Sequence, residues 1–226
     1  MRRVAAAAAC DVRLQIRYGL YGVSVLMVLV WGALLGVLSS RVTLRPELLV
    51  PPFIVINLQV TTFFFMAALV LFEKSEGVLT ALVVSPLRDM EYLMSKSITL
   101  TALATAETLL IAAFLFGRDV HWHGAIVASI LLGVLYTLAG FITVVRFESI
   151  NQFLLPSVLV ITASMLPLLA HFGVAGHQWM ILHPVEPALL VARGDGGAGA
   201  LAGAIAWCVA AAVWARREFR RFVVKA

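Results

Sequence analysis

The stretch EKSEGVLTALVVSPLRDMEYLMSK, residues 73–96, decides how this chain is organised. It is a long charged insertion between two apolar runs that are each long enough to cross a lipid bilayer. Its middle, residues 78–84, carries no charge, so the stretch is too apolar for a solvated linker and too charged for lipid. Proline disfavours helical geometry in the residue before it, so Ser85-Pro86 predicts a break between two helices. We therefore expect a helix that leaves the membrane and a short second helix, Ser85 to Lys96, lying across the surface.

The composition of the chain is that of a membrane protein. Hydrophobic residues make up 62% of it and charged residues 13%, whereas globular domains average roughly half and a quarter. Apolar runs of about 18 or more residues are candidate membrane-spanning helices. They predict spans at residues 18–38, 51–72, 97–117, 124–145, 153–174 and 198–215. We expect an all-α, multi-pass protein of the cell (inner or plasma) membrane, with one domain over residues 1–226 and a kink at Pro156 or Pro167.

The positions of the cations predict the orientation of these spans. With both termini in the cytoplasm, the inner segments carry 13 Lys and Arg residues and the outer segments carry 4, a bias toward the inside. The inner cations are Arg2, Arg3, Arg13, Arg17, Lys74, Arg88, Lys96, Arg146, Arg216, Arg217, Arg220, Arg221 and Lys225. The outer cations are Arg41, Arg45, Arg118 and Arg193. Because the cations flank spans and do not form one basic face, the net charge of +5 predicts no nucleic-acid partner.

The first 17 residues predict a helix that lies on the cytoplasmic membrane surface. Arg13 and Arg17 are four residues apart and share one side of it. A frayed basic tail is the alternative, because residues 5–9 favour helix but are weakly amphipathic. Asp11 and the two arginines interrupt any apolar run here, so we do not expect a cleavable signal.

The motifs of catalysis are missing from the sequence. It holds no G-x-x-x-x-G-K-[ST] phosphate loop, no HExxH, no clustered cysteine ligands and no G-x-S-x-G turn. His121 and His123, with Asp119, supply too few ligands for a metal site and are interpreted as interfacial histidines. We therefore expect no catalytic residues, no metal and no cofactor bound by this chain, and a membrane enzyme is disfavoured.

Polar side chains inside two predicted spans are the candidates for a transport pathway. The second span carries a polar band next to a run of phenylalanines, and the third carries an acid among threonines. The candidates are Asn57, Gln59, Thr61, Thr62 and Glu107. Either the band faces a second copy of the chain across a two-fold axis and lines a path, or it forms hydrogen bonds within one chain. For Glu107 we favour a structural role over a proton-sensing one, because no intramembrane cation accompanies it.

The central loop resembles that of ATP-binding-cassette (ABC) transporter type-2 permeases. The matching residues are Glu73-Lys-Ser-Glu-Gly77, Val83-Val-Ser-Pro-Leu-Arg88, Glu91-Tyr-Leu93 and Lys96. A second match precedes the last span and consists of Ile181-Leu-His-Pro184, Pro187 and Arg193. Val78 stands where Thr is common in the family, and His183 stands where Asn is usual. Residues 145–153, VRFESINQF, make the chain most similar to the fluoroquinolone export permease branch.

The resemblance implies a permease subunit that exports a hydrophobic or amphiphilic, drug-like compound. Two copies of a separate ABC ATPase subunit would hold ATP and Mg and drive transport, and a second permease copy or a close relative would complete the path. The residues expected to couple to the ATPase are Glu73, Glu76, Gly77, Ser85, Pro86, Leu87, Arg88, Asp89, Glu91, Tyr92 and Lys96. Leu87, Tyr92 and Leu93 would form the apolar contact. Residues 146–152 would form a second contact, and residues 175–197 would form short re-entrant helices at the outer mouth.

A membrane scaffold or assembly subunit, which binds a soluble partner without transport, is the alternative function. On spacing alone, residues 73–96 fit an ordinary structured loop of a multi-pass protein as well as they fit a docking site. An adjacent reading frame that encodes a phosphate-loop ATPase would favour the transporter. Apolar paths accept many ligands, so the sequence names neither the substrate nor the choice between homodimer and heterodimer.

Overall fold

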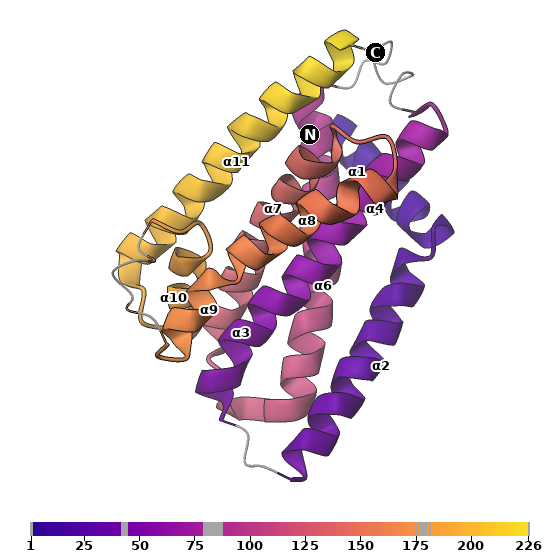
Figure 1. Cartoon of the computed structure of the whole chain (residues 1–226). Helices are drawn as coiled ribbons and strands as arrows, with labels where there is room; N and C mark the ends of the chain where they lie inside the picture. Colours follow the sequence, from indigo (N-terminus) through magenta and orange to yellow (C-terminus); the bar gives the residue numbers. More distant parts are fainter. Residues whose placement is uncertain are drawn as a thin grey trace.

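The structure, a computed structural model, describes residues 2–41, 45–78, 88–174, 176, 180 and 182–225. Every element that these residues form is a helix (Figure 1). In chain order the elements are α1 (Arg2–Arg17), α2 (Leu20–Ser39), α3 (Pro46–Leu58), η1 (Gln59–Phe63), α4 (Phe64–Ser75), α6 (Asp89–Phe116), η2 (Gly117–Asp119), α7 (Trp122–Val144), α8 (Ile150–Ser164), α9 (Leu166–His171), α10 (Glu186–Arg193) and α11 (Gly197–Lys225). Segments long and apolar enough to cross a membrane are Leu20–Ser39, Pro46–Ser75, Asp89–Phe116, Trp122–Val144, Ile150–His171 and Gly197–Phe222. The prediction of an all-α protein with six spans is confirmed.

The second and fourth spans form the centre of the bundle. The buried share of the most apolar stretch is 72% in the second span (α3, η1 and α4) and 61% in the fourth (α7). It is 6% in α2 and 11% in α11, which lie at opposite edges of the bundle (Figure 1). A long helix that is apolar all round and remains uncovered is suited to lipid as its solvent. These two edge helices therefore place the bundle in a membrane.

The close approach of α7 to its neighbours depends on glycine. A Cβ added at Gly140 would lie 2.6 Å from the carbonyl oxygen of Phe63 in η1. A Cβ added at Gly133 would lie 2.7 Å from the methyl carbon of Thr101 in α6. Inside lipid, helices associate largely through close packing of this kind, because the hydrophobic effect no longer drives them together. The two glycines allow α7 to sit between the second and third spans.

Two of the spans are interrupted along their length. η1 is a single π-helical turn, which widens the second span at its buried centre. The fifth span breaks at Met165, and Pro167 lies in the first turn of α9. Proline lacks a backbone donor and its ring clashes with the carbonyl group four residues earlier, here that of Ala163 at the end of α8, which explains the position of this break. The kink expected at a proline thus falls at Pro167, while α8 runs through Pro156.

The third span begins earlier than the sequence predicts. α6 is unbroken over 28 residues, so residues 89–96 form its first turns and not a separate surface helix. Glu91 Oε2 accepts the backbone N–H of Arg88 at 2.9 Å and so satisfies a donor that the helix start leaves unpaired. This bond lets the helix begin at the membrane surface and continue into it. Residues 85–87, the rest of the predicted surface helix, lie outside the described residues.

Both termini lie at the same end of the bundle, as an even number of spans requires (Figure 1). α1 packs against α6 at this end. α10 lies at the opposite end, where Leu189 and Ala192 are buried against the bundle. The assignment of the first end to the cytoplasm, and of α10 to a re-entrant element of an outer mouth, stays a prediction. Residues 175, 177–179 and 181 of that segment lie outside the described residues.

Candidate functional site

A buried ion cluster joins three helices at the end of the bundle that holds both termini. The side chain of Lys96 in α6 is fully buried. Its Nζ lies 2.9 Å from Asp11 Oδ1 in α1 and 2.6 Å from Glu73 Oε1 in α4. A buried ammonium is costly unless it is paired and hydrogen-bonded, and here two carboxylates receive it. The Asp11–Glu73–Lys96 cluster therefore holds α1 and α4 against the start of α6.

Neutral donors complete this cluster. Its two carboxylates share one ammonium group, so further donors are needed to satisfy their remaining oxygen atoms. Tyr92 Oη donates to Glu73 Oε2 at 2.6 Å. The hydroxyl of Ser95 donates to Asp11 Oδ2. All of these groups are buried, so in this conformation the cluster is a joint between helices and not a surface.

A second set of contacts links the loop after α7 to α4 and α11. Lys74 Nζ donates to the carbonyl oxygens of Val145 and Phe147, at 2.7 and 2.8 Å. A cation at this position satisfies carbonyls that the helix end leaves open. Arg146 pairs with Glu218 of α11 at 2.9 Å. Residues 146–152, which are predicted to form a second contact with a partner, are therefore bonded at their start to α4 and α11.

The structure divides the residues predicted to couple to a partner into three groups. The exposed or half-buried ones are Glu76, Gly77, Arg88, Asp89 and Glu91. The buried ones are Glu73, Tyr92, Leu93 and Lys96. Those outside the described residues are Ser85, Pro86 and Leu87. The buried group packs on neighbouring helices in this conformation, which differs from the apolar contact expected of Tyr92 and Leu93. Direct contact with a partner stays a prediction for the exposed group.

The polar face of α1 is a feature that the sequence did not predict. Asp11 and Gln15 are four residues apart in an alanine-rich helix, and Ser95 and Thr99 have the same spacing in α6. Gln15 Nε2 donates to Thr99 Oγ1 at 2.8 Å, one helical turn from the ion cluster. Matching polar pairs at this spacing are the signal that could have indicated the contact. The spacing indicates that each helix has a polar side, but it does not indicate which two helices face each other.

The polar band of the second span is buried within one chain. Asn57 Nδ2 donates to Thr108 Oγ1 at 2.9 Å, and Thr61 Oγ1 donates to Glu107 Oε2 at 3.4 Å. Gln59 Nε2 donates to a backbone carbonyl of α8 at 3.1 Å. Each of the five candidate pathway residues is at most 3% exposed: Asn57, Gln59, Thr61, Thr62 and Glu107. Of the two interpretations, hydrogen bonding within one chain is what this conformation shows, and a role in a pathway stays a prediction.

The histidines at the opposite end make hydrogen bonds. His171 Nδ1 accepts the Nε–H of Arg193 at 2.8 Å. His183 Nδ1 accepts the backbone N–H of Val185 at 3.2 Å, so its Nε2–H is left to donate to Ala163 O at 3.0 Å. Burial lowers the pKa of His183 below its ordinary value. Among the described residues, no group of three or more His, Cys, Asp or Glu side chains could hold a metal ion.

Six apolar spans, with a buried ion cluster at one end and a polar band inside, define a multi-pass membrane protein. The chain belongs to the fluoroquinolones export permease protein family, whose sequence profile matches residues 2–226. It is similar to two fluoroquinolones export permease proteins of Mycobacterium tuberculosis, from strains CDC 1551 / Oshkosh and ATCC 25618 / H37Rv. Each is 30% identical over 194 residues, which cover 84% of this chain and 80% of the relative. No solved structure matches the chain. The resemblance to drug-export permeases is confirmed.

Proposed function

We propose that this chain is the membrane-spanning subunit of an ATP-driven exporter that moves a hydrophobic or amphiphilic, drug-like compound out of the cell. The observation that carries the proposal is the family match over residues 2–226. The name of the two relatives makes a fluoroquinolone the first compound to test. The sequence lacks a phosphate loop, so ATP and Mg would be held by a separate ATPase subunit.

The end of the bundle that holds both termini is suited to receive that ATPase. Arg88 and Glu76 are exposed there, and Lys96 and Glu73 are buried behind them. Charges 3 Å apart in a buried site resist separation, so a displacement of the start of α6 would carry α1 and α4 with it. The contacts of Lys74 and Arg146 extend this connection to α7 and α11. The exposed residues would receive the partner, and the buried cluster would transmit its movement.

A second permease copy, or a close relative, fits the exposed edge of the bundle. α2 presents a row of exposed apolar side chains, among them Val25, Leu29 and Val37, and only a small part of it is covered. Lipid and a second permease can both cover such a face. The resemblance to type-2 permeases favours two permeases with two ATPase subunits. The transport path would then lie between the two permeases, because one bundle of six spans leaves little room for it.

Charge reversal at Arg88 tests the coupling. The Arg88→Glu variant keeps the backbone N–H that bonds Glu91, so α6 can still begin at the same place. Fluoroquinolone export and drug-stimulated ATP hydrolysis should fall together by several-fold, because the charge that position 88 presents to the partner is reversed. Arg13→Glu, which reverses another exposed cation at the same end, is the matched control and should leave both near wild type.

Two results would count against the proposal. If Arg88→Glu and Arg13→Glu leave both rates unchanged, the start of α6 does not contact the ATPase. If the wild-type chain binds the ATPase in reconstituted vesicles and exports no fluoroquinolone or other amphiphile, it is a scaffold and not an exporter.

A further inference from the structure

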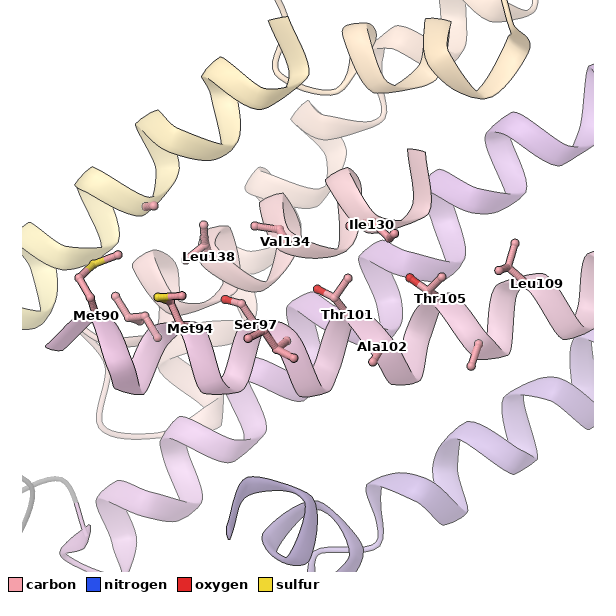
Figure 2. A pocket seen from close by; sticks show the side chains of 14 residues that line it. Met90, Met94, Ser97, Thr101, Ala102, Thr105, Leu109, Ile130, Val134 and Leu138 are labelled. Atoms are coloured by element: carbon pink, nitrogen blue, oxygen red, sulfur yellow. The ribbon is translucent and has the colours of Figure 1, made fainter. Parts of the chain in front are cut away.

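A groove runs along α6. It is bordered by α7 and by Ala212 of α11. Its volume is about 680 Å³, within the range of roughly 300–1,000 Å³ that drug-sized ligands occupy in proteins. Figure 2 shows its floor, which extends along α6 from Met90 to Leu109, with Val134 and Leu138 of α7 opposite. At 1.5 Å per residue this floor is roughly 28 Å long, close to the thickness of the hydrocarbon layer. None of the described lining residues is charged.

Two threonines that line this apolar groove have buried hydroxyl groups without a partner among the described residues. Thr101 and Thr105 are 6% and 9% exposed, and neither Oγ1 makes a hydrogen bond. Figure 2 shows both side chains on the edge of α6 that faces Ile130 and Val134. An unpaired hydroxyl removed from water costs on the order of 1–3 kcal/mol, so it requires an explanation.

Other threonines of the spans show how this cost is usually avoided. Thr108, Thr137 and Thr143 each donate to the carbonyl oxygen four residues earlier, at 2.7 to 2.8 Å. Thr101 and Thr105 could make the same bond from the same kind of helix and do not. Both Oγ1 atoms are covered by neighbouring atoms in this conformation, so a rotation about the Cα–Cβ bond would turn each hydroxyl toward a group that lies in the groove. A hydrocarbon chain offers no acceptor, so the group must come from a more polar molecule.

The groove is accessible from the hydrocarbon layer. Met94, Ile98 and Ile130 line it and are each about half exposed, at 48%, 52% and 47%. A compound dissolved in the membrane can therefore reach the groove sideways, without passing through water. Met90 and Met94 are flexible and polarisable, and methionine adapts well to aromatic ring systems.

We infer that the groove between α6, α7 and α11 binds a drug-sized, membrane-dissolved amphiphile that accepts hydrogen bonds from Thr101 and Thr105. The inference rests on the proposed export function, and it identifies the site at which the exported compound is first held by the protein. An apolar body with a few acceptors, such as an aromatic ring system with carbonyl groups, matches both the apolar walls and the two hydroxyls.

Removal of the two hydroxyls tests the inference. In the Thr101→Val, Thr105→Val double variant the shape of each side chain is kept. Binding of ciprofloxacin to the purified protein in lipid nanodiscs, measured by drug fluorescence, should weaken about tenfold, the loss expected for two hydrogen bonds. Thr143→Val removes a hydroxyl that is already bonded to its own helix and lies outside the groove, so it should bind as wild type does.

Filling the groove provides a second, independent measurement. Ala106 lines it, so Ala106→Trp should abolish drug binding, whereas Ala113→Trp on an exposed part of α6 outside the groove should not. The binding measurement uses the permease alone, so it decides the site even if export with an ATPase fails and the proposed function with it. Wild-type drug affinity in both groove variants, with loss of co-purified phospholipid from Ala106→Trp, would assign the groove to lipid and overturn the inference.

Discussion

Among single residues, Lys96 combines the largest cost of burial with the most complete set of partners. Besides its two carboxylates, its Nζ lies 4.8 Å from the ring centre of Tyr92, a distance at which an aromatic face attracts a cation. The resemblance to type-2 permeases predicts that Lys96 couples to a partner subunit, whereas its side chain is fully buried. The structure differs because Asp11, 85 residues earlier in the chain, supplies a carboxylate that no local pattern could indicate.

Replacement of Lys96 by Met should destabilise the protein by roughly 3–5 kcal/mol, because two buried carboxylates then face each other without a cation. The melting temperature in detergent measures the effect. A triple variant that adds Asp11→Asn and Glu73→Gln should recover much of the loss, since no charge is left buried. Arg17→Met is the control, because its 3.8 Å pair with Glu76 is exposed and should contribute little. Equal melting temperatures for Lys96→Met and wild type would contradict this account.

The hydrogen bonds of His183 predict a pH effect at the opposite end of the bundle. Its pKa is lowered in the folded protein, so the unfolded chain binds more protons and stability rises with pH. This contribution is fully present above the ordinary histidine pKa of about 6.5 and is lost as the pH falls through the lower folded value. The protection of the Val185 amide against hydrogen exchange, relative to its intrinsic rate at each pH, should therefore fall between pH 7.5 and pH 5.

An asparagine at position 183 is the matched control for this effect. In His183→Asn, the side-chain oxygen can still accept the Val185 N–H, and it does not titrate. The loss of protection at low pH should then disappear. The same loss of protection in both proteins would remove His183 from the explanation.

At the scale of elements, the sequence predicted where helices lie and not how they pack. Apolar runs indicated six spans because lipid requires about 20 such residues per crossing, and this requirement holds whatever the neighbours are. Gly32 and Gly36 have the four-residue spacing that favours close helix packing, yet both have open space where a Cβ would lie. The close contacts are made instead by Gly133 and Gly140, which are seven residues apart. Packing of this kind depends on the neighbouring helix, so a single chain segment does not encode it alone.

Substitution of Gly140 by Ala tests the packing of α7. The added Cβ would lie 2.6 Å from a backbone oxygen of η1, which cannot move without displacing the π-helical turn. We expect a loss of about 1–3 kcal/mol, typical of overpacking, measured as a lower melting temperature in detergent. Gly36→Ala is the control and should be neutral or stabilising by up to about 1 kcal/mol, because helix interiors favour Ala over Gly. A destabilisation of the same size in both variants would indicate a general effect of glycine and not a specific contact.

For the whole molecule, the prediction that matters most is its direction in the membrane. Single cysteines at exposed positions test it in a background without Cys10 and Cys208. His123→Cys, in the exposed first turn of the fourth span, should react with a membrane-impermeant reagent added outside the cell. Arg221→Cys, at the C-terminal end of α11, should react only after the membrane is opened. Labelling of both positions from the same side would contradict the arrangement of six spans with both termini in the cytoplasm.

The distance along the chain between the members of the ion cluster has a consequence for how the protein is made. Asp11 emerges from the ribosome long before Lys96, and Glu73 emerges between them. Until the third span is synthesised, the carboxylates of Asp11 and Glu73 lack the ammonium group of Lys96. No ion pair then holds α1 on the bundle, so α1 stays at the membrane surface. α1 therefore packs against the bundle only after α6 is synthesised, and the Asp11–Glu73–Lys96 cluster forms only on a chain whose first three spans are inserted. A chain that stalls earlier would expose the polar face of α1 with Asp11 unpaired, a state that quality-control proteases could distinguish from the finished protein.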